Sequence, residues 1–95
     1  INQKQMAVDD DGRFRMVLSQ RDPGVPNWLD CGGHPRGLLT YRWFWPKGDP
    51  AFESRVLPVA EVAACLPAGS ATLDAAARRE DVRRRKQHLA WRFRT

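Results

Sequence analysis

The sequence has few cysteines and no long apolar run. Among its 95 residues only Cys31 and Cys65 are cysteines, which excludes the dense disulfide framework of small secreted domains. No apolar run approaches the ~18 residues needed to cross a bilayer, and no signal-peptide pattern opens the chain. We therefore expect a cytoplasmic protein with reduced thiols and no membrane span.

The excess positive charge is confined to the end of the chain. The formal net charge is +5. Residues 1–73 hold eight basic and eight acidic side chains, so their charges cancel, and residues 74–95 carry the whole excess. The sequence pI of about 10.0 therefore gives no information about the binding partners of residues 1–73. An apolar content of 42% with 28% charged residues argues against disorder.

The first twenty residues carry the pattern of a hairpin. Asp11-Gly12 is a strong turn dipeptide, since glycine accepts the positive φ of a tight turn. Apolar and polar residues alternate over residues 13–19, as in a half-buried strand. Residues 4–8 are the weaker incoming arm. A loop rich in proline and glycine follows at residues 20–37.

Two further strands are expected in the middle of the chain. Residues 38–45, LLTYRWFW, form the strongest strand pattern, and both faces are substantially apolar, so we expect cover on both sides. Residues 54–62, SRVLPVAEV, predict another strand, which Pro58 places at a sheet edge or ends.

Helices are expected after these strands. Residues 60–66 predict a short helix that Pro67 stops. Residues 73–93 predict a long basic helix, with Thr72 as its N-cap and Asp74 in its first turn. Its narrow apolar stripe consists of Ala75, Val82, Leu89 and Phe93.

These elements offer too few surfaces to bury the large aromatic side chains. We therefore expect the rest of a longer polypeptide, or another subunit in a homo-oligomer, to complete the core. The start at Ile1 rather than Met also favours a chain cut from something longer. The aromatic residues in question are Trp28, Trp43, Phe44, Trp45 and Phe52.

The proline- and glycine-rich loop holds the candidate ligand-binding or loop-anchoring residues. Asn27 and Asp30 side chains can bond to nearby backbone groups, and Trp28 can pin the loop to the core. Cys31 and His34 are residue types that bind zinc or form a nucleophile pair, which leaves an enzyme or metal site as an alternative. No supporting ligand spacing or hydrolase signature accompanies them, so we predict no catalytic residue, metal or cofactor.

Nucleic-acid binding is the other alternative. Basic side chains on one helix can contact phosphates, and an exposed Trp can stack on a base. However, Glu80 and Asp81 stand at helical spacing from the arginines, which predicts ion pairs along a solvated face. We therefore expect nucleic acid not to be the partner. The residues of this alternative are Arg83, Arg84, Arg85, Lys86 and Trp91.

Three motifs and the closing arginine-rich helix carry a resemblance to a known family. The motifs are DGRFRMVLS, PNWLD and GLLTYRWFWPKG. Together these features resemble the bacterial domain-of-unknown-function family twelve-fourteen. The matching positions are Asp11-Gly12, the run from Asn27 to Leu29, and residues 42–46, within a resemblance that covers residues 8–59. It implies a jelly-roll-like β-sandwich of which this chain is the C-terminal portion. The family carries no established catalytic residues, so none is transferred.

The expected fold is mainly β (α+β): a single domain, or the C-terminal fragment of a larger β-sandwich. Residues 1–59 would supply strands and a loop, residues 60–66 a short helix, and residues 73–93 the basic helix. The expected function is a binding or assembly module within a larger bacterial protein, rather than an enzyme.

Overall fold

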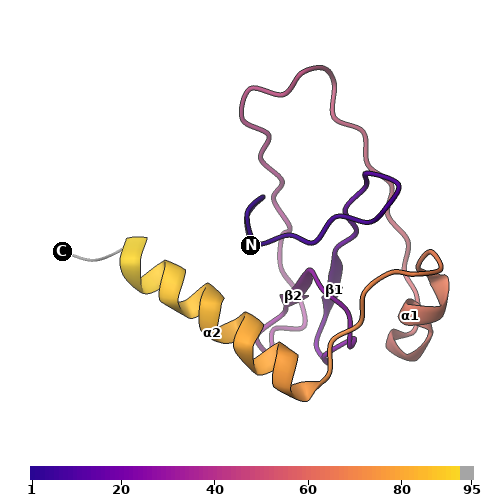
Figure 1. Cartoon of the computed structure of the whole chain (residues 1–95), viewed down its shortest axis with the longest axis vertical. Helices are drawn as coiled ribbons and strands as arrows, with labels where there is room; N and C mark the ends of the chain where they lie inside the picture. The colour runs from indigo at the N-terminus through magenta and orange to yellow at the C-terminus, as the bar shows by residue number, and fades with distance from the viewer. Residues whose placement is uncertain (93–95) are drawn as a thin grey trace.

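The computed structural model describes residues 1–92 and contains two short strands and three helical segments (Figure 1). Its Cα radius of gyration is 14.3 Å, whereas a compact domain of this length has about 12 Å. The chain is therefore loosely packed. The elements are β1 (Val17–Ser19), β2 (Trp28–Asp30), the 3-10 helix η1 (Val59–Glu61), α1 (Val62–Cys65) and α2 (Ala75–Arg92).

The two strands form a parallel pair. Val17 lies opposite Trp28, and Ser19 lies opposite Asp30. A loop of residues 20–27 connects them, and Asn27, at the end of that loop, has a φ of 61°. Because parallel strands start at the same end of a sheet, this loop must return the chain along the full length of β1.

The turn expected at Asp11-Gly12 is present, but the hairpin is not. The Asp9 amide donates to the Arg13 carbonyl at 2.8 Å, and Gly12 has a φ of 80°. No strand precedes this turn in the described residues, and β1 begins only at Val17. Since β1 pairs with β2 instead, the predicted antiparallel arms were wrong.

The prediction of a mainly β, jelly-roll-like sandwich is also wrong. Residues 38–45 and residues 54–58 form no strand, and the backbone of residues 35–57 makes no hydrogen bond within the described chain. Strand propensity expresses how well side chains pack on a pleated, half-buried surface. The local pattern of residues 38–45 is a strand pattern, but no second strand pairs with it.

The helices lie close to their predicted positions. Residues 60–66 correspond to η1 and α1, which end where Leu66 turns extended before Pro67. The long helix is α2, although Asp74 caps it rather than Thr72: the Ala77 amide donates to Asp74 Oδ1 at 2.8 Å. The predicted last residue, Phe93, lies outside the described residues.

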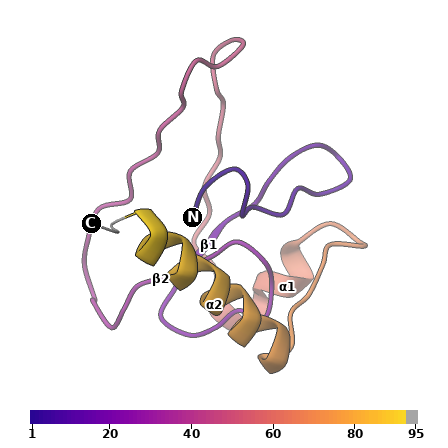
Figure 2. The ribbon, with the colours of Figure 1, turned by 60° about the vertical axis from the view of Figure 1, so that its left-hand side comes forward.

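The interior is small and mostly polar. Among the described residues Val25 is the one buried hydrophobic side chain, at 1% exposure, and it is accompanied by Ser19, Asn27 and Arg78. Figure 2 shows α2 passing alongside the strands. Arg78 is the residue that α2 buries, so the predicted stripe through Val82 does not form a buried face. Within residues 1–92, no helix combines the length and apolarity that a membrane span requires.

Candidate functional site

Asn27 is the hydrogen-bonding centre of the loop between the strands. Its Oδ1 accepts from the Ala7 amide at 2.8 Å, and its Nδ2 donates to the Ala7 carbonyl at 2.8 Å. The same Nδ2 donates to the Arg15 carbonyl at 3.0 Å. One buried side chain therefore joins three chain segments, and it satisfies backbone groups that would otherwise lack partners.

Trp28 joins the strands to α2. Its indole Nε1 donates to the Ser19 carbonyl at 3.1 Å, and the Arg78 guanidinium lies 5.1 Å from the ring centre. The Arg85 guanidinium donates to the Trp28 carbonyl. Arg85 also forms an ion pair with Asp81 at 3.1 Å. These contacts hold α2 against β2 through cations rather than through an apolar stripe.

Arg78, the buried side chain of α2, bonds both to the loop between the strands and to α2 itself. Its Nε donates to Asp22 at 3.0 Å, its Nη1 to Asp81 at 3.0 Å, and its Nη2 to the Val25 carbonyl. Partial burial raises the pKa of Asp22, but the Gly24 amide and Arg78 outweigh it, so the net shift is downward. Asp22 therefore keeps its charge to a lower pH than an unperturbed aspartate does.

The structure places Asp30, Cys31 and His34 in successive tight turns. Asp30 Oδ1 accepts from the Gly32 amide at 2.8 Å, and the His34 amide donates to the Cys31 carbonyl at 3.0 Å. Gln20 donates to the His34 carbonyl at 2.6 Å. Cys31 is half-buried and His34 is exposed. No group of three or more potential metal ligands occurs among residues 1–92.

The basic residues of α2 are largely paired with acids of the same helix. Glu80 accepts from Arg83 at 2.7 Å and from Arg84 at 3.2 Å, which confirms the predicted ion pairs. The Arg83 guanidinium, followed by that of Arg84, holds the pKa of Glu80 at about 2. Lys86 is exposed, and Trp91 is exposed and lies 6.4 Å from the His88 ring. Arg83, Arg84 and Arg85 therefore already have carboxylate partners.

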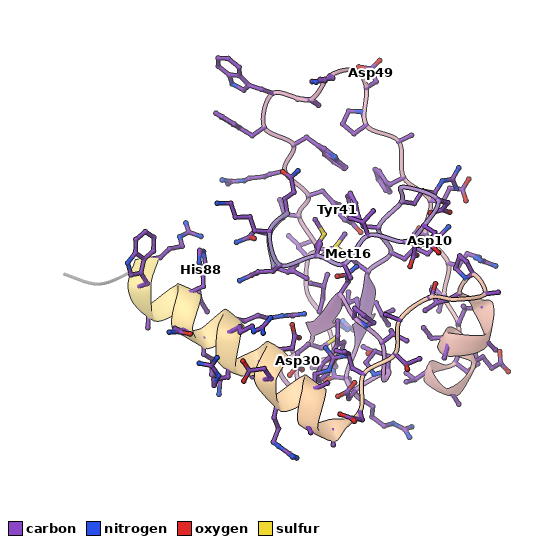
Figure 3. All side chains as sticks on the ribbon, in the orientation of Figure 1. Asp10, Met16, Asp30, Tyr41, Asp49 and His88 are labelled. Carbon is purple, nitrogen blue, oxygen red and sulfur yellow. The ribbon has the colours of Figure 1, made fainter. Side chains whose placement is uncertain are left out.

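The long loop before η1 exposes five aromatic side chains. We call residues 38–52 the aromatic segment. The rings of Tyr41, Trp43 and Phe52 stack on one another at centroid distances of 5.3 to 6.2 Å. Phe44 and Trp45 form a separate stack at 5.7 Å, and these two residues are 90% and 85% exposed. Figure 3 shows this loop standing away from α2, with Asp49 at its tip.

A cavity of about 340 Å³ lies between the first turn and the chain that leads to α2. Asp9 and Arg15 line it, joined by an ion pair at 2.6 Å, and Ser70 donates to Asp9 at 3.2 Å. Hydrogen bonds from the Arg15 side chain and the Arg13 backbone lower the pKa of Asp11 to about 2. The Asp9 and Asp11 carboxylates already have a cationic partner in Arg15. These residues therefore stabilise the turn at Asp11-Gly12.

Two features of this arrangement escaped prediction from the sequence. Arg78 is one of several basic residues in the predicted helix. It lies four residues before Val82 and so on the same helix face, but this spacing alone does not predict that its side chain is buried. The strand pattern of residues 38–45 predicts cover on both faces, whereas the structure leaves the aromatic segment exposed. The signal for exposure in the sequence is the shortage of predicted surfaces to bury the aromatic side chains.

Comparisons with protein-family models, with curated proteins and with solved structures found no significant match to this chain. The sequence and the geometry therefore carry the functional argument.

Proposed function

We propose that this chain is a binding or assembly module that joins another polypeptide through the aromatic segment. One observation carries the proposal: Val25 is the one buried hydrophobic side chain among residues 1–92, whereas five aromatic side chains are exposed in one loop. The exposed rings form two stacks within one segment. Large exposed apolar patches mark interaction surfaces. Aromatic residues are also enriched where protein interfaces contribute most to binding.

The two strands and α2 form the packed part of this module. Asn27 and Arg78 connect the first turn, the loop between the strands and α2 through buried polar contacts. This network leaves the aromatic segment outside, so a partner can cover it without displacing the packed part. Membership in family twelve-fourteen remains a proposal that rests on the short motifs.

The two alternative functions have less support. For nucleic-acid binding, phosphate contacts would compete with the ion pairs that Glu80 and Asp81 make with the α2 arginines. For an enzyme or metal site at Cys31 and His34, the turns around these residues are accounted for by backbone hydrogen bonds. The aromatic segment is therefore the better candidate.

Site-specific photo-crosslinking tests the proposal. A benzophenone amino acid replaces Phe44 in one variant and Val56 in a matched control, in bacterial cells that produce the chain. Both positions are exposed and apolar, but Val56 lies outside the aromatic segment. We expect adducts to polypeptides, identified by mass spectrometry, from position 44 and not from position 56. Equal yields at both positions, or none at either, would contradict an assembly surface at the aromatic segment.

A further inference from the structure

In the aromatic segment, residues 38–43 have no bend and no strand partner within the described chain, whereas the chain bends at Phe44 and Trp45, where Trp45 has a φ of 52°. The backbone of residues 35–57 makes no hydrogen bond within the described chain, although residues 38–45 are rich in β-favouring side chains. The rings of Tyr41 and Trp43, two residues apart, stack at 5.8 Å, as neighbours on one face of a strand do. A row of free backbone donors and acceptors is a template for adding another strand.

On the basis of the proposed assembly function, we infer that the partner is a second copy of this chain, paired antiparallel through residues 38–44. The two-fold axis passes through Tyr41. Each Leu39 then lies opposite Trp43 of the second copy, and each Leu38 lies opposite Phe44. A symmetric pair of this kind uses the same patch on both copies and closes without further growth.

The side-chain chemistry selects this register. With the axis at Tyr41, Arg42 lies opposite Thr40 of the second copy, so no like charges face each other. Moving the axis by one residue to Arg42 would place two guanidinium groups directly opposite. It would also pair Thr40 with Phe44, where the proposed register pairs Phe44 with Leu38.

The exposed area is sufficient for a stable pair. The five aromatic residues of the segment are between 37% and 90% exposed. An aromatic side chain contributes roughly 150–250 Å² when buried, so covering these five in both copies removes on the order of 1,300 Å² from water. Stable interfaces bury about 1,200–2,000 Å² in total, so a pair in which the whole aromatic segment packs against the second copy, beyond the paired residues, reaches the lower end of that range.

Sedimentation and cysteine crosslinking of the whole chain test the inference. Wild-type protein is expected to shift from monomer to dimer as its concentration rises. Replacing the two most exposed rings (Phe44→Ser with Trp45→Ser) is expected to raise the dimer Kd at least about thirtyfold, the effect of losing a dominant interface contact. The control Val56→Ser leaves Kd unchanged. Because all three residues are exposed, circular dichroism should show the same helix content in each variant.

The register is tested in a chain whose own cysteines are replaced by alanine. Tyr41→Cys places two thiols directly opposite each other, within the Cα separation of 4.4–6.8 Å that a disulfide spans. Arg42→Cys places them diagonally, beyond that range. We expect a covalent dimer from Tyr41→Cys and little from Arg42→Cys.

Each result separates the two proposals. A wild-type chain that stays monomeric while position 44 still crosslinks to another polypeptide overturns self-pairing and leaves the assembly function standing. A dimer that Phe44→Ser with Trp45→Ser does not weaken overturns self-pairing through the aromatic segment, and the assembly function falls with it if position 44 also gives no crosslink. Equal disulfide yields from Tyr41→Cys and Arg42→Cys overturn the register.

Discussion

The guanidinium carbon of Arg78 lies 5.1 Å from the centre of the Trp28 ring and thereby joins α2 to β2. The same side chain bonds to Asp22 and to the Val25 carbonyl, so it contacts the loop between the strands at two positions. A buried cation is tolerated here because carboxylates and a carbonyl surround it. The helix is therefore held by a network in which no member can be removed alone without leaving others unpaired.

Arg78→Ala is expected to lower the free energy of unfolding by about 3 kcal/mol, because it leaves Asp22 and a buried carbonyl without their partner. Urea unfolding followed by circular dichroism measures the change. Arg79→Ala is the matched control, since Arg79 is exposed on the next position of α2. A loss in Arg78→Ala no larger than in the control would show that the network does not hold the helix.

Asn27→Ala is expected to lower the free energy of unfolding by about 3 kcal/mol, since three hydrogen bonds are lost at a buried position. Asn27→Gly should be about 1 kcal/mol less damaging, because glycine relieves the positive φ but makes none of the bonds. Chemical denaturation of both variants, with hydrogen exchange at the Ala7 amide, checks this. Unchanged protection of Ala7 would contradict the role assigned to Asn27.

The substitution Asn27→Asp changes the hydrogen-bonding groups of this side chain while keeping its size. A carboxylate oxygen would replace Nδ2 and face the carbonyls of Ala7 and Arg15, so the variant should be less stable than Asn27→Ala at neutral pH. Burial and these carbonyls raise the pKa of the new carboxyl above its unfolded value. Its destabilisation should therefore shrink as pH falls through that pKa. A pH-independent defect in thermal unfolding would argue against this geometry.

Helix α2 should lose stability in acid through Glu80. Its pKa is about 2 in the folded chain, against 4.5 for an unperturbed glutamate, chiefly because of Arg83. The stabilisation is therefore present above the unfolded pKa and is lost as pH falls toward about 2. Circular dichroism between about pH 6 and pH 2 should show a smaller acid loss of helix in Glu80→Gln than in wild type. Glu61→Gln, outside α2, is the control and should titrate like wild type.

Gly24→Ala is expected to cost about 1–2 kcal/mol of stability through backbone strain alone. Gly24 has a φ of 71°, and a Cβ there would lie 3.8 Å from its nearest neighbour, the Leu73 carbonyl, which is an ordinary contact. Gly37→Ala is the control because its φ lies outside the left-handed region and its surroundings are open. Thermal unfolding of the two variants gives the comparison, and equal melting temperatures would refute the strain argument.

Features that depend on near neighbours in the chain can be predicted from the sequence. Pro67 after residues 60–66 and the run of good helix formers after Asp74 placed both helical regions, since helix hydrogen bonds join residues four apart. The ion pairs of Glu80 with Arg83 and Arg84 followed from the same spacing. The Asp30 side chain bonds two residues ahead, as short polar side chains in turns do.

Which distant segments come into contact depends on tertiary packing, and local sequence patterns do not show it. Strand pairing depends on residues distant in the chain, so the alternation after Gly12 could not show that β1 would pair with β2 instead of residues 4–8. The burial of Arg78 likewise depends on Asp22, fifty-six positions away, and no periodicity within α2 marks it. Residues 38–45 have the local pattern of a strand, but pairing requires a second strand, and within residues 1–92 none is paired with them.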